Sequence, residues 1–170
     1  LSSRYGLGEL SIFLSFGPLL TLGTGFAIAS ETIIPYSNEF YNLLIIGIPI
    51  GLLTTNILFI NQFPDHASDK KVGKNHLVVL FGKKASRWIY GLNLVLALGS
   101  LYYIAENLLT GTKQMLFLYM LIPITMFYSY FLLSGLFKYY NSRKLIKYNI
   151  HTIYFHMLFS FVYMIILANF

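Results

Sequence analysis

Five apolar segments, each about 20 residues long, constrain this chain more than any other feature of its sequence. A hydrocarbon layer about 30 Å thick is crossed by about 20 residues of α-helix, because each residue advances the helix by about 1.5 Å. Charged residues make up 11% of the 170 residues, against about 25% in a typical soluble domain. The sequence therefore predicts an all-α, polytopic transmembrane helix bundle that forms one membrane-embedded domain over residues 1–170. The predicted spans cover residues 10–30, 41–62, 87–106, 115–137 and 149–169.

The first apolar segment has a second interpretation. Residues 27–29 read Ala-Ile-Ala, which resembles the cleavage site of a secretory signal peptide, and Arg4 could be its basic start. However, the apolar stretch is about 20 residues long, whereas the apolar region of a signal peptide has about 7–15. Glu9 also lies at its start, and further spans follow. We therefore interpret residues 10–30 as a membrane span.

Basic residues are distributed unevenly between the two sides that these spans define. Eleven of the twelve lysines and arginines fall on one side, and Lys113 alone falls on the other. Cytoplasmic loops of membrane proteins carry an excess of Lys and Arg. The sequence thus predicts a multi-pass protein of the cell membrane, surrounded by membrane lipid, with the segment 63–86 on the cytoplasmic side. Topology accounts for the positive charge, so no nucleic-acid partner is predicted. The eleven are Arg4, Lys70, Lys71, Lys74, Lys83, Lys84, Arg87, Lys138, Arg143, Lys144 and Lys147.

The segment between the second and third spans carries the chemical signal. Asn61, Asp65 and Asp69 are spaced four residues apart, so on a helix they follow one face with about 6 Å between successive positions along the axis. The chain has no cysteine and no other aspartate. Mg²⁺ binds in proteins through one or two carboxylates plus substrate phosphates. We therefore predict Asp65 and Asp69 as catalytic ligands of Mg²⁺, with Asn61 as a supporting ligand.

Lysines directly after this row favour a phosphate-bearing ligand. Lys70 and Lys74 are spaced i, i+4 and would share a helix face, whereas Lys71 could face solvent. We predict that Lys70 and Lys74, together with Asn61, contact a diphosphate.

Two aspects of the segment stay open from sequence alone. Pro64 is expected to end or kink the helix before Asp65, which makes residues 63–86 a predicted loop. The acidic and basic residues could also pair with one another in an ordinary solvated connector. His66 and His76 flank the acidic row, and a role in the site is the less favoured interpretation for both.

The same segment resembles a known family motif. In the second aspartate-rich motif of the UbiA superfamily of prenyltransferases, N-x3-D-x3-D-[KR]-x2-G-K leads into a short stretch that ends in Leu-Gly or Phe-Gly. This chain has that pattern from Asn61 to Lys74 and then reaches Phe81-Gly82. Residues 4–18 are also similar to the family, closest to its 1,4-dihydroxy-2-naphthoate polyprenyltransferase branch of menaquinone biosynthesis. The resemblance covers residues 4 to about 90.

The resemblance implies a nine-helix fold in which the five spans are helices five to nine. It implies Mg²⁺-dependent transfer of a prenyl chain from a polyprenyl diphosphate to an aromatic quinone precursor. The family's first motif, N-D-x2-D-x3-D, is absent from these residues, so the chain is expected to be the C-terminal part of the enzyme and inactive alone. The oligomeric state is left open.

Two alternatives remain at this point. One is another lipid prenyltransferase of the same family, such as a digeranylgeranylglyceryl phosphate synthase. The other is a non-catalytic membrane subunit or a transporter fragment. A transporter would place ionisable groups near the middle of the membrane, whereas Asp65 and Asp69 lie at the end of a span.

Overall fold

The computed structural model describes residues 5–29 and 33–168, and its regular elements are six α-helices. Because α1 and α2 together make one span, the structure has five helical segments long and apolar enough to cross a membrane. The prediction of an all-α bundle with five spans is thus confirmed, while the correspondence to helices five to nine stays a prediction. The helices are α1 (Leu7–Phe16), α2 (Pro18–Ala29), α3 (Asn38–Lys71), α4 (Leu77–Asn107), α5 (Thr112–Tyr139) and α6 (Leu145–Ala168).

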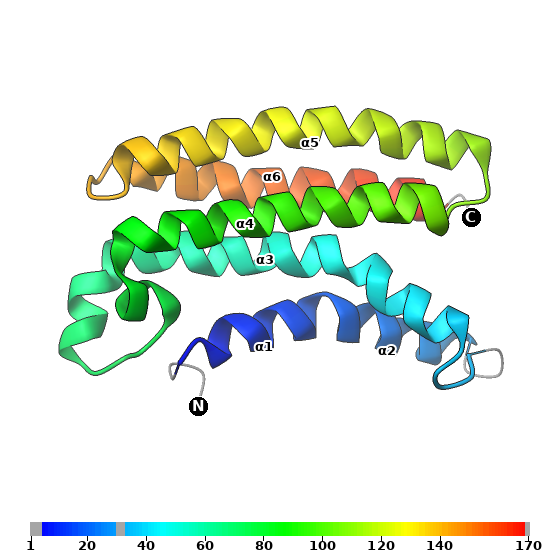
Figure 1. Ribbon diagram of the computed structural model, residues 1–170, viewed down its shortest axis with the longest axis horizontal. Coiled ribbons are helices and arrows are strands. Elements are labelled where there is room, and N and C mark those ends of the chain that lie inside the picture. Colours follow the sequence, from blue (N-terminus) through cyan, green and yellow to red (C-terminus); the bar gives the residue numbers. More distant parts are fainter. Residues whose placement is uncertain (1–4, 30–32, 169–170) are drawn as a thin grey trace.

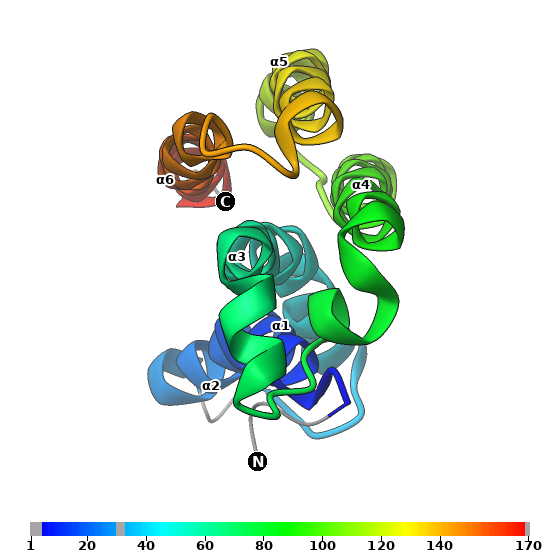
Figure 2. The same ribbon diagram turned by 90° about the vertical axis from the view of Figure 1, so that its left-hand side faces the viewer.

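Helix α3 is the central element of the bundle (Figures 1 and 2). It packs against α4, α4 packs against α5, α5 against α6, and α6 returns to α3. The α1 and α2 helices cover the opposite side of α3. Outward-facing apolar side chains such as Val95, Ile124 and Phe127 are exposed, as expected of helices surrounded by lipid.

Glycines allow the first span to lie directly on α3. The span bends at Gly17-Pro18, where proline cannot donate a backbone hydrogen bond. A Cβ added to Gly17 would lie 2.7 Å from the carbonyl oxygen of Gly47 and 2.8 Å from the Cα of Gly51. Small residues four apart permit this backbone contact between membrane helices. The contact fixes α1 beside the central helix.

Helix α3 continues past Pro64, but its last turns run in a different direction from its long part (Figures 1 and 2). The helix therefore does not end at this proline, and of the two predicted effects the structure shows the kink. The helix has 34 residues and is about 51 Å long, so one end extends beyond a hydrocarbon layer of about 30 Å. Proline removes one backbone hydrogen bond, but Ile60 and Phe63 on the preceding turn are fully buried and hold the helix by packing. The predicted loop 63–86 is accordingly mostly helical.

Helix α4 contains a second departure from the predicted loop. Its first turn, from Leu77, is separated from its long part by Gly82, which has φ 74° and ψ 157°. Only glycine adopts this region without strain. The long part then runs past the predicted span of 87–106.

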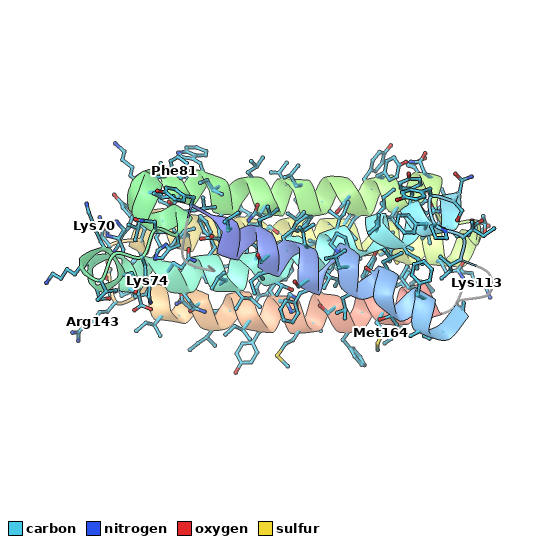
Figure 3. The ribbon with its side chains drawn as sticks, turned by 90° about the horizontal axis from the view of Figure 1, so that it is seen from below. Lys70, Lys74, Phe81, Lys113, Arg143 and Met164 are labelled. Atoms are coloured by element: carbon cyan, nitrogen blue, oxygen red, sulfur yellow. The ribbon has the colours of Figure 1, made fainter. Side chains whose placement is uncertain are left out.

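The two ends of the bundle differ in charge (Figure 3). Lys70, Lys74 and Arg143 lie at one end, whereas Lys113 lies at the other. We call the first the basic end; it comprises the start of α1, the α3–α4 connection and the α5–α6 connection.

Candidate active site

The acidic row lies at the end of α3, at the basic end of the bundle. Asn61, Asp65 and Asp69 all belong to α3, which continues to Lys71. Pro64 separates Asn61 from the two aspartates, and the last turns of the helix bend away from its long part (Figures 1 and 2). Asp65 and Asp69 both follow Pro64, so their carboxylates lie on neighbouring turns, about 6 Å apart along the axis.

The end of α3 returns Lys74 to Asp69. Gly73 has φ 75°, and its N–H donates to the carbonyl of Lys70 at 3.3 Å. The N–H of Lys74 donates to the carbonyl of Asp69 at 3.0 Å. These two bonds and the left-handed glycine constitute a Schellman motif, which reverses the chain at a helix C-terminus. The Lys74 ammonium consequently lies 2.7 Å from Oδ1 of Asp69.

The ion pair with Asp69 stabilises the charged form of Lys74. The hydrogen bond to the Asp69 carboxylate raises the pKa of Lys74 above its ordinary value. The Lys74 side chain is 50% exposed, whereas the Asp69 side chain is 14% exposed. Lys74 is thus a solvent-facing cation paired with a carboxylate that is mostly buried.

His76 holds the second oxygen of Asp69. Its Nδ1 accepts the N–H of Val79 at 3.4 Å and caps the N-terminus of α4. We therefore assign the ring proton to Nε2, which donates to Oδ2 of Asp69 at 3.1 Å. The His76 side chain is 6% exposed. The sequence did not favour a role for His76 in the site. The one sequence feature that points to its capping role is its position just before an apolar helix, where helix caps occur.

The remaining predicted residues are less closely associated. The Asp65 side chain is exposed and, within residues 5–29 and 33–168, has no hydrogen bond or ion pair. Asn61 accepts a hydrogen bond from Asn149 of α6 at 2.9 Å, which links the start of the row to the last helix. Lys70 and Lys71 are exposed.

These residues fit Mg²⁺ as an incomplete ligand set. Asp65 offers a carboxylate with no partner, and each Asp69 oxygen retains a free lone pair beyond its single hydrogen bond. All the atoms available to bind a metal here are oxygens, which Mg²⁺ prefers as ligands. Among the residues that the structure describes, no three His, Cys, Asp or Glu side chains form a complete metal cage. The arrangement suits an ion whose other ligands are water and phosphate.

Comparison with known proteins agrees with the motif. The UbiA prenyltransferase family matches residues 1–166. The chain is 35% identical over 100 residues to 1,4-dihydroxy-2-naphthoate octaprenyltransferase of Escherichia coli (strain K12). That alignment covers 59% of this chain but 29% of the relative. No solved structure matches the chain. With nearly its whole length matched, the chain belongs to the UbiA prenyltransferase family.

Proposed function

We propose that the protein containing this chain transfers a prenyl chain from a polyprenyl diphosphate to an aromatic quinone precursor, with Mg²⁺ bound at Asp65 and Asp69. The observation that supports this most is the α3 terminus, where two carboxylates on adjacent turns lie beside a lysine that the helix end folds back. Family membership and the similarity to a 1,4-dihydroxy-2-naphthoate octaprenyltransferase favour a prenyl diphosphate and a naphthoate acceptor.

Each residue of the site has a distinct role in this proposal. Asp65 and Asp69 would hold the metal, and the Asn61 amide oxygen would support it or contact the diphosphate. Mg²⁺ at this position supplies positive charge that offsets the charge developing on the leaving diphosphate. Lys70 and Lys74 contact diphosphate oxygens directly.

Lys74 is the partner of Asp69 that would change position when substrate binds. Its side chain is 50% exposed, whereas that of His76 is 6% exposed. Transfer of the Lys74 ammonium from Oδ1 of Asp69 to a diphosphate oxygen leaves Oδ1 available to the metal. His76 keeps Oδ2 in position throughout, as outer-shell partners of metal ligands commonly do.

The chemical step requires a site that stabilises a leaving anion. The bond between the allylic carbon and the diphosphate oxygen breaks, and its electron pair leaves with the diphosphate. A ring carbon of the acceptor forms the new carbon–carbon bond, and the ring regains aromaticity when that carbon loses the group it carried, either a proton to water or a carboxylate as carbon dioxide. The prenyl tail lies among the apolar spans, and the basic end faces the cytoplasm, where it attracts the anionic diphosphate.

Product analysis with the full-length protein tests the proposal. Membranes containing it are incubated with a polyprenyl diphosphate and 1,4-dihydroxy-2-naphthoate, with Mg²⁺ or with EDTA, and products are identified by mass spectrometry. We expect a prenylated naphthoate only with Mg²⁺. A parallel reaction offers geranylgeranylglyceryl phosphate; product there alone would replace the aromatic acceptor by a lipid one. Absence of transfer to either acceptor would refute the proposed activity.

A further inference from the structure

A buried glutamate from the first span contacts both sides of the aspartate-bearing turn. Glu9 lies on α1 and is 3% exposed. Its Oε1 accepts a hydrogen bond from the Gln62 amide of α3 at 2.9 Å and from the backbone N–H of Leu77, the first residue of α4, at 3.1 Å. Gln62 and Leu77 thus meet at one carboxylate oxygen of Glu9, from which they are 53 and 68 positions away in the sequence.

Burial of a carboxylate at this place calls for a reason. Removing a charged group from water is costly unless hydrogen bonds compensate it, and here Oε2 of Glu9 is buried without a partner among the described residues. Two features offset the cost. The first N–H groups of a helix have no partner within the helix, and a helix N-terminus favours a negative charge. Glu9 supplies α4 with both a hydrogen-bond acceptor for the Leu77 N–H and a negative charge at its N-terminus.

The two bonds lie close to the candidate metal ligands in the structure. Leu77 directly follows His76, whose ring donates to Asp69. Gln62 precedes Asp69 by seven residues on the same helix, α3. Glu9 consequently connects the two sides of the turn, one on each helix, that together fix the Asp69 carboxylate.

We propose that Glu9 is a positioning residue for the metal–diphosphate site. It holds the start of α4 against α3, which aims His76 at Asp69 and keeps that carboxylate ready for the metal. This inference rests on the proposed function, because it concerns the same site. Glu9 itself contacts neither metal nor substrate.

Two variants of Glu9 separate hydrogen bonding from mere packing. Glu9→Leu removes both bonds and fills the space with an apolar side chain. Glu9→Gln has the same shape and keeps an oxygen for both donors, while removing the charge. We therefore expect Leu to disrupt the site and Gln to restore it. The exposed Glu39 at the opposite end provides the matched control, Glu39→Leu.

The measurements use the full-length protein and do not require turnover. The first is hydrogen–deuterium exchange of the peptide that contains the Leu77 amide, which should be at least about fivefold faster in Glu9→Leu, the effect of losing one net hydrogen bond. The second is Mn²⁺ binding in the presence of inorganic diphosphate, followed by electron paramagnetic resonance. Its affinity should fall measurably, by up to about 10-fold, because Glu9→Leu loosens the outer-shell partner His76 without removing it. Glu9→Gln and Glu39→Leu should match the parent in both.

The possible outcomes are distinct. Unchanged exchange in Glu9→Leu, or faster exchange with unchanged Mn²⁺ affinity, would overturn the inference. If Glu9→Leu does not fold, Gln62→Leu tests it instead: the Leu77 amide should stay protected while Mn²⁺ affinity falls, and unchanged affinity would again overturn it. A protein that lacks prenyl transfer but shows these Mn²⁺ effects would refute the proposed reaction alone.

Discussion

Gly73 is the residue at which the α3 terminus depends most directly on backbone conformation. Its φ of 75° is required for the two hydrogen bonds of the Schellman motif, which bring Lys74 to Asp69. A Cβ built on Gly73 meets no atom within 4 Å. Replacement by alanine therefore introduces no clash, and its cost is conformational only.

The expected magnitude follows from that cost. An L-residue in the left-handed region is less stable by about 1–2 kcal/mol, which corresponds to about a 5- to 30-fold change in population. The turn is exposed and can relieve this strain locally, without unfolding the bundle. We expect Gly73→Ala to lower kcat/KM for the prenyl diphosphate by about 5- to 30-fold while the melting temperature changes little. Gly73→Asn should be milder, because asparagine tolerates this conformation.

Steady-state kinetics of the full-length enzyme, with prenyl diphosphate varied at saturating Mg²⁺, provide the assay. The matched control is Gly99→Ala, since Gly99 is also surrounded by open space but lies within regular helix α4. Alanine is favoured there, so activity should be unchanged. Parental activity of Gly73→Ala, or equal losses for alanine and asparagine, would show that the left-handed turn does not position Lys74.

Three further predictions concern the charged residues of the basic end. Asp65→Asn or Asp69→Asn should lower Mg²⁺-dependent turnover by about 100-fold or more without unfolding the protein, because each removes a charge from the metal site. Product formation and thermal stability measure the two effects, and near-parental rates would contradict the metal assignment. Lys74→Ala should raise KM for prenyl diphosphate and lower kcat, whereas Lys83→Ala should change neither constant, because Lys83 lies after Gly82 in the long part of α4 and not in the α3 terminus. Equal small effects would mean that both residues only mark topology. A cysteine at Val72 should react with an impermeant reagent only after the membrane is opened, and labelling from outside intact cells would reverse the proposed orientation.

Several properties follow from the sequence alone because they depend on local composition and spacing. The length and hydropathy of the segments predict five helices able to cross a membrane, since an unpaired backbone cannot lie in hydrocarbon, and the structure has five such helical segments. The uneven distribution of lysine and arginine predicts that one end of the bundle is basic, and the structure confirms it. The four-residue spacing of Asp65 and Asp69 places them on one helix face once that helix exists.

Pro64 shows what a local pattern leaves open. Its effect on an isolated helix predicts an end or a kink; the helix bends, but buried residues on the preceding turn keep α3 helical to Lys71. Helical stability in a folded protein comes mostly from such packing, which a local pattern does not contain.

The contacts around the acidic row were decided only by the tertiary structure. Asn61 bonds to Asn149 of α6, and Glu9 of α1 bonds to Gln62 and Leu77. Each pair is separated by more than 50 positions, so no spacing in the sequence indicates it. The Glu9 contacts depend on the close approach of the first span to α3, which the glycines of both helices allow, and the Asn61 contact depends on the packing of α6 against α3. Local chemistry thus selects the residues of the site, and helix packing selects which of them act together.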